Sequence, residues 1–233
     1  MNQHTKYAAN DRMGELICEN YNLLLVMSRF GLSLGFGDKT VRQVCEEQGV
    51  HTETFLAVVN FIYDSCYSHD DFKDDISIPA LIEYLRQSHV YFLKFKLPTI
   101  RRELIEAIDL SGGEVSLLII RFFDEYAKEV KAHMDYENTV VFEYVTELLK
   151  GKLSEDYNIT YFADRHDNIE VKLSELKNII VKYYPANSDN NALNNVLFDI
   201  YSCEEDLEIH RRVEDDMFIP LIKDVENKVK KNA

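Results

Sequence analysis

The sequence predicts an all-α protein, in which an antiparallel four-helix bundle follows a small helical domain. Only eight of the 233 residues are Gly and four are Pro, and residues 114–233 contain a single Gly, Gly151. This scarcity favours long helices over a turn-rich β fold. Four long segments within residues 77–230 carry apolar residues at steps of three and four, which is typical of a bundle seam. The connections are short, so neighbouring helices are expected to be antiparallel.

Residues 1–70 are expected to form the small helical domain. A first helix is predicted over residues 15–30 and is followed by a glycine-bearing turn, GLSLGFGDK. Thr40 is expected to cap a short helix that ends at Gly49. Thr52 is expected to cap the next helix, TETFLAVVNFIYDSC.

A polar stretch, SHDDFKDD at residues 68–75, is the expected boundary between this domain and the bundle at residues 77–230. The first bundle helix is predicted to begin at Ser77, because Pro79 falls in its first turn. Pro98 is expected either to kink this helix or to begin its second half.

The other three bundle helices are predicted at about residues 114–150, 159–184 and 191–230. Gly151 is expected to end the second helix, and Pro185 follows the third. Each helix has one apolar stripe. The predicted stripes are Leu81, Leu85, His89 and Phe92; Phe122, Tyr126, Val130, His133, Glu137, Val140 and Tyr144; Phe162, His166, Ile169, Leu173, Leu176 and Ile180; and Val196, Ile200, Cys203, Leu207, His210, Glu214, Met217 and Leu221.

One pattern, H-x43-H-x3-E, occurs twice in the chain, offset by 77 residues. It places one His on the apolar stripe of each bundle helix, and a Glu one turn after the second His of each pair, because residues i and i+4 share a face. These six residues are the candidate metal ligands: His89, His133, Glu137, His166, His210 and Glu214.

A single His on an apolar stripe is most often a hydrogen-bonded core residue, and a Glu there can form an ion pair at a bundle end. Six such residues in a doubled pattern indicate a two-metal site instead, because a buried carboxylate is costly unless a cation accompanies it. Imidazole and carboxylate ligands suit Fe, Mn or Zn. The expected cofactor is two iron ions with an oxo or hydroxo bridge, with Mn or Zn as substitutes.

Charge and cysteine content exclude several classes of protein. The formal net charge is −15, and residues 1–70 and 71–233 are both acidic, which argues against binding nucleic acid or an anionic membrane surface. No apolar run is long enough to span a bilayer, and the N-terminus has no signal-peptide pattern. The four Cys show no C-x-x-C spacing and predict reduced thiols in a cytoplasmic protein.

The segments around these residues resemble a known family. AHMDYENTVVF (132–142) and IHRRVEDDMFIP (209–220) are similar to the His-x-x-x-Glu signature of hemerythrin-like, or HHE cation-binding, domains. SHVYFLKFKLPTI (88–100) and RHDNIEVKL (165–173) resemble the other two His-bearing helices. Residues 13–57 resemble the N-terminal module of the iron–sulfur cluster repair di-iron proteins, also described as regulators of cell morphogenesis and NO signalling.

Two departures from that family bear on function. The module usually carries a Cys-Cys pair in its glycine turn, whereas this turn reads Leu34-Gly35-Phe36-Gly37. The family also usually supplies a fifth His between the first two bundle helices, which this chain lacks. Glu170, one turn after His166, could replace it as a ligand or could be an ordinary surface residue.

The resemblance implies a non-haem di-iron protein that binds or reacts with NO, O2 or peroxide, in iron–sulfur cluster repair or in nitrosative or oxidative stress. Iron–sulfur proteins and a second copy of the chain are then possible partners. A non-catalytic sensor or carrier of O2 or iron is the alternative. A DNA-binding regulator is a third reading, because residues 40–60 mimic helix-turn-helix spacing, but the second of these helices offers no Lys or Arg.

Overall fold

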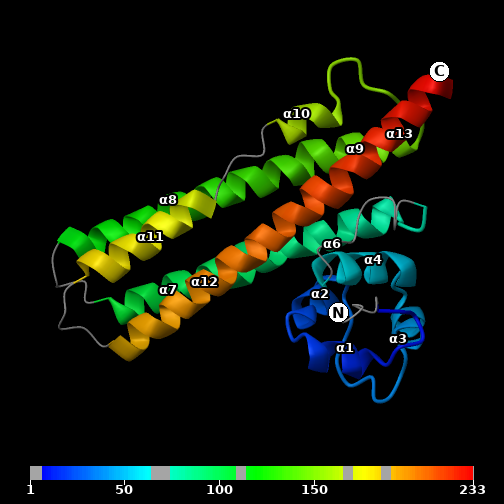
Figure 1. Cartoon of the computed structure of the whole chain (residues 1–233). Coiled ribbons are helices and arrows are strands. Elements are labelled where there is room, and N and C mark those ends of the chain that lie inside the picture. The colour runs from blue at the N-terminus through cyan, green and yellow to red at the C-terminus, as the bar shows by residue number, and fades with distance from the viewer. Residues whose placement is uncertain (1–6, 64–73, 109–113, 165–169, 185–189, 233) are drawn as a thin grey trace, which may run out of the picture. The chain divides into compact units, whose positions relative to one another are not determined.

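The computed structural model describes residues 7–63, 74–108, 114–164, 170–184 and 190–232 (Figure 1). The regular secondary structure of these described residues is helical. The β pairing among them is limited to an isolated antiparallel bridge between Arg12 and Thr40. The all-α prediction is confirmed. Within the same residues, no helix has the length and apolar character needed to cross a membrane.

The chain divides into two compact units, and one of them consists of residues 89–143 and 161–211. This unit is a bundle whose members lie along one another in Figure 1. Its helical segments are the last turn of α6 (Ile78–Tyr91), η1 (Phe92–Lys96), α7 (Leu97–Ala107), α8 (Glu114–Tyr136), η2 (Glu137–Val141), α11 (Glu170–Tyr183) and most of α12 (Asn190–Val213).

Side-chain contacts show that neighbouring helices in this unit are antiparallel. His89 lies beside Asn138, whereas Arg101, further along the first helix, pairs with Asp124, earlier in the second. The first and fourth helices run in opposite directions for the same reason, because His89 contacts His210 and Lys96 pairs with Asp199.

Ion pairs join each helix of this bundle to the next, outside a core of apolar side chains. They form a closed ring around the bundle: Arg101–Asp124, Lys172–Glu129, Lys177–Glu204 and Lys96–Asp199. The core between the helices contains Phe92, Ile100, Phe123, Tyr126, Val130, Leu173, Leu176, Val196, Ile200 and Cys203, among others. Burial of this apolar surface is the main force that holds the helices together.

The second compact unit consists of residues 1–88, 144–160 and 212–233. Its aromatic rings join the N-terminal helices to the first bundle helix, since Phe30 lies 5.4 Å from Phe55 and 4.9 Å from Tyr84 between ring centroids. Arg212 also lies over the Phe61 ring, at 5.1 Å. The helical segments of this unit are α1 (Met13–Glu19), α2 (Leu23–Arg29), α3 (Val41–Gln48), α4 (Thr52–Tyr63), most of α6, α9 (Phe142–Leu149) from its third residue, the start of α10 (Ile159–Ala163), η3 (Glu214–Phe218) and α13 (Ile219–Asn232).

The prediction of one helix over residues 15–30 was wrong, because α1 ends at Glu19 and α2 begins at Leu23. The backbone N–H of Asn22 donates to the side chain of Asn20 at 3.1 Å. Such a local side-chain bond offers the backbone an alternative to the helix and interrupts it.

The predicted caps of the next two helices had different outcomes. Thr40 and Gln43 form a capping box at the start of α3, and Gly49 ends that helix at φ +72°, as expected. Thr52, however, is the first residue of α4 and not its cap. The cap is His51, whose Nδ1 accepts from the backbone N–H of Thr54 at 3.3 Å.

The bundle helices contain breaks that the apolar stripes do not predict. The expected third helix is present as α10 and α11, and residues 165–169 between them lie outside the described residues. Pro98 stands in the first turn of α7, so it begins the second half of the first helix.

The predicted boundary at residues 68–75 lies mostly outside the described residues, and the division into 1–70 and 77–230 stays a prediction.

Within the described residues, three π-helical segments interrupt the bundle helices, and one of them shifts the buried apolar face of its helix. The predicted stripe of the second helix passes through Val140, but Val140 is exposed and Val141 is fully buried. A π turn holds more residues than an α turn, so the apolar position moves one residue along the chain after Glu137. The same helix buries Phe123 and Met134, whereas the predicted Phe122 is only half-buried.

Candidate metal centre

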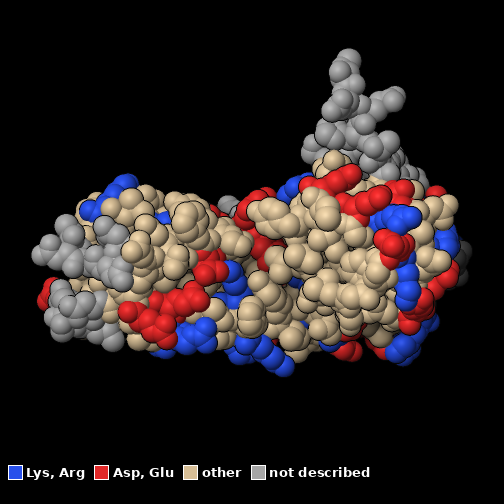
Figure 2. Space-filling view, turned by 90° about the horizontal axis from the view of Figure 1, so that it is seen from below, with Lys and Arg blue, Asp and Glu red and all other residues tan. Residues whose placement is uncertain are grey.

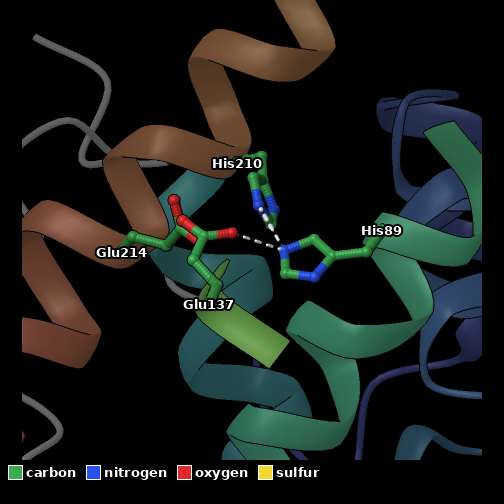
Figure 3. A group of neighbouring side chains, drawn as sticks. All are labelled: His89, Glu137, His210 and Glu214. Carbon is green, nitrogen blue, oxygen red and sulfur yellow. Dashed lines mark hydrogen bonds and ion pairs between the residues drawn. The ribbon is translucent and has the colours of Figure 1, made fainter. Parts of the chain in front are cut away.

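Four side chains from distant parts of the sequence converge on one another (Figure 3). They are His89 from α6, Glu137 from the start of η2, His210 from α12 and Glu214 from the start of η3. Each can offer one ligand atom such that all four atoms lie within 4.8 Å of one another. All four residues are buried, with exposures of 0–4%.

The distances in this group fit donors that face a common ion. His89 Nε2 lies 3.2 Å from His210 Nε2 and 3.0 Å from Glu137 Oε2. Two ligands at right angles, each about 2.1 Å from one metal ion, stand about 3 Å apart. The two imidazoles therefore present their Nε2 atoms at the separation that neighbouring ligands of one metal would have.

Glu137 faces two different imidazoles with its two oxygens. Its Oε2 is 3.0 Å from His89 Nε2, and its Oε1 is 2.9 Å from His133 Nε2. His133 lies one turn before Glu137 on the same helix and is half-buried. A carboxylate in this position has the geometry to bridge two metal ions.

Asn138 lies next to Glu137 and contacts the far side of the His89 ring. Its Oδ1 is 3.1 Å from His89 Nδ1, close enough to accept a hydrogen bond from an Nδ1–H. That tautomer leaves the lone pair on Nε2, which is the atom that faces the other ligands. Outer partners of this kind commonly orient a metal-binding histidine.

Aromatic rings cover the imidazoles. Phe142 stacks on His89 at 5.7 Å between ring centroids, and Phe92 lies 5.8 Å from His210. Phe162 stacks on His133 at 6.5 Å. These rings limit the access of water to the ligand atoms, which strengthens the electrostatic attraction between a carboxylate and a cation.

The π-helical segments begin at the two site carboxylates. The N–H of Phe142 donates to the carbonyl of Glu137, and that of Ile219 donates to the carbonyl of Glu214, each across five residues. The doubled sequence pattern therefore has a doubled structural counterpart. Single π turns inside α-helices occur frequently at functional sites.

The sequence analysis named six ligand candidates, and the structure brings five of them together. Four form the convergent group, and His133 joins it through Glu137. His166 lies outside the described residues. Glu170 is the first residue of α11, and its side chain is not among the parts of the chain that the structure describes. Sequence reasoning placed Phe92 and Phe162 on apolar stripes without a role at the site, and it missed Asn138 and Phe142, because these roles depend on which helices face each other.

A comparison with known families gives a match that covers more than half of the chain. Residues 80–222 match the model of the hemerythrin HHE cation-binding domain. The chain belongs to this family. The match spans all six candidate ligands and identifies the bundle as a hemerythrin-like cation-binding domain, in agreement with the geometry of the His and Glu group.

Neither the curated proteins nor the solved structures gave a significant match to this hemerythrin-like chain. The family match begins at residue 80, so it does not extend to the N-terminal helices.

Proposed function

We propose that this hemerythrin-like protein is a non-haem di-iron protein that binds or reacts with NO, O2 or peroxide. The observation that carries the proposal is the position of Glu137, whose two oxygens face His89 and His133 at 3.0 and 2.9 Å. A carboxylate whose two oxygens face two different imidazoles has the geometry to bridge a pair of metal ions.

The donor set divides into two groups around Glu137. His89, His210 and Glu214 would hold one metal ion, and His133 would hold the other together with His166, whose assignment rests on sequence spacing alone. Imidazole and carboxylate donors without thiolate suit iron, and Mn or Zn could replace it. When bound, an iron pair would supply redox electrons and an open coordination position for a small ligand.

The chain's own residues orient and shield the site. Asn138 Oδ1 would accept a hydrogen bond from a proton on His89 Nδ1, and in that tautomer Nε2 remains a lone-pair donor. Phe92, Phe142 and Phe162 lie against the imidazoles and shield from water the sides of the rings that they cover.

A role in iron–sulfur cluster repair, or in the response to nitrosative or oxidative stress in the cytoplasm, is part of the proposal and rests on the resemblance of the N-terminal module. A thiol route for handing over iron is not part of it. The glycine turn at residues 31–39 has no Cys, and burial raises the pKa of the nearby Cys45 thiol to about 11. A thiolate is the form that binds metal.

The structure offers little support for the DNA-binding reading. The second helix of the helix-turn-helix pattern is α4, and eight of its twelve residues are buried. A recognition helix must instead present its side chains to the major groove. Acidic and basic side chains are also interspersed on the face shown in Figure 2, so that this face is not a broad basic surface of the kind that DNA-backbone binding requires.

Anaerobic reconstitution with Fe(II), followed by exposure to NO, O2 or peroxide in separate samples, tests the proposed function. A change in the near-ultraviolet and visible absorption of the loaded protein with at least one of them supports it. Catalytic consumption of the small molecule distinguishes an enzyme from a carrier or sensor. A loaded protein whose spectrum responds to none of the three would contradict the proposal.

A further inference from the structure

A cavity of about 690 Å³ lies between the first two bundle helices, with His89 and Asn138 among its lining residues. Its lining runs from His89 on α6 to Arg101 on α7, and from Asn138 on η2 back to Phe123 on α8. At 1.5 Å per residue, the twelve steps from His89 to Arg101 extend over about 18 Å. The cavity is therefore elongated, and its volume is that of a site for a small organic molecule.

The walls of this cavity are mainly apolar. Each facing helix contributes hydrophobic side chains at helical spacing, which together make a continuous surface along the groove. The apolar lining residues are Val90, Leu93, Leu97, Phe123 and Ala127, with Pro98 beside them. The accessible part of this surface, at Val90, Leu93 and Ala127, gains free energy when an alkyl chain or ring removes it from water, whereas Leu97 and Phe123 are already buried.

Four basic side chains also line the cavity, and the lining contains one carboxylate, that of Asp135. The basic residues are Lys94, Arg101, Lys128 and Lys131. This excess of positive charge occurs in a chain with a formal net charge of −15. A local charge opposite to that of the whole molecule indicates that the cavity selects an anionic group, because the rest of the protein repels one.

Two of these cations are available to a ligand. Arg101 makes a two-point contact with Asp124, and Lys131 pairs with Asp135. Lys94 and Lys128 take part in no ion pair found within the described residues, and they come from facing helices. They can therefore meet one anionic head group from two sides, while the ligand's apolar part lies against the walls.

We propose that this cavity binds a medium-chain aliphatic monocarboxylate, with the carboxylate held by Lys94 and Lys128 and the alkyl chain laid along the accessible apolar lining at Val90, Leu93 and Ala127. A single carboxylate matches the two available cations, and an unbranched chain matches the elongated apolar wall. The site needs no metal for binding, so it stands independently of the proposed di-iron function.

Calorimetric titration of the full chain with dodecanoate tests the proposal, with metal-free and metal-loaded protein measured separately. We expect one molecule to bind per chain in both forms. Acetate, which lacks the tail, and dodecanol, which lacks the charge, are each expected to bind at least ten-fold more weakly. Equal binding of dodecanol and dodecanoate would overturn the proposal, because the cations would then play no part.

Two variants locate the site. The double variant K94Q/K128Q is expected to weaken dodecanoate binding at least ten-fold, and A127W is expected to block the cavity without changing its charge. The matched control is K223Q/K228Q, which removes the same net charge from exposed positions on α13 and should bind as the wild type does. Dodecanoate affinity within two-fold of wild type in K94Q/K128Q, with the helical content unchanged, would refute the assignment, and so would unchanged binding in a folded A127W.

Discussion

Replacement of Asn138 is expected to change metal affinity in a direction set by the new side chain. Asn138 Oδ1 lies 3.1 Å from His89 Nδ1, and loss of such an outer partner costs about ten- to one-hundred-fold in metal affinity. Asn138 is half-buried, so water can reach the exposed Nδ1–H in N138A. We therefore expect a loss of about ten-fold in N138A, or about 1.4 kcal/mol.

The size-matched variants N138L and N138D separate orientation from packing. A leucine fills the same space without an acceptor and excludes water, so we expect a loss of up to about one-hundred-fold. An aspartate accepts a stronger, charge-assisted bond, so N138D is expected to bind metal at least as tightly as the wild type. Competition with a chromophoric chelator measures all three. Affinities within two-fold of wild type in both N138A and N138L would refute the idea that this bond orients His89.

Two other predictions concern stability away from the metal centre. Glu226 is buried and accepts from Tyr144 Oη at 2.6 Å and from the first backbone N–H of α10 at 2.7 Å. We expect the free energy of unfolding, measured in urea, to fall by about 3–5 kcal/mol in E226A and by about 1–2 kcal/mol in Y144F. Equal losses in the two variants would contradict the larger contribution assigned to Glu226. Burial, and then its contact with Asp199, raises the pKa of Glu103. A raised carboxyl pKa stabilises the fold below the ordinary carboxyl pKa, and this contribution is lost as the pH rises through the folded-state value. E103Q should therefore raise the melting temperature at neutral pH but not in acid, unlike the exposed control E106Q, and a gain that is the same at both pH values would argue against this linkage.

The bundle and five of its candidate ligands could be predicted because they follow from periodicity. A helix places i and i+4 on one face, so a doubled His-x-x-x-Glu pattern on apolar stripes predicts side chains that point inward. Leu81, Leu85 and Ile200 are fully buried for the same reason. The signal is carried by many residues of each helix, so errors at single positions do not destroy it.

The features that could not be predicted depend on single local contacts. The π turn at Glu137 moves the buried position from Val140 to Val141. The spacing of apolar residues before Glu137 does not predict this π turn. The break after Glu19 depends on an Asn20 side chain that bonds to the backbone. The role of Asn138 required knowledge of which helix faces it, which periodicity within one helix does not contain.

The most direct test of the account is the number of metal ions held by the full chain and by its E137Q variant. Glutamine keeps the size of the side chain but removes the charge that would attract two cations. The matched control is E125Q, which changes an exposed Glu on α8. Elemental analysis after reconstitution and desalting should find two iron ions per chain in the wild type and in E125Q, and at most one in E137Q. A full pair in E137Q, or no more than one ion in the wild type, would contradict a site built around a bridging Glu137.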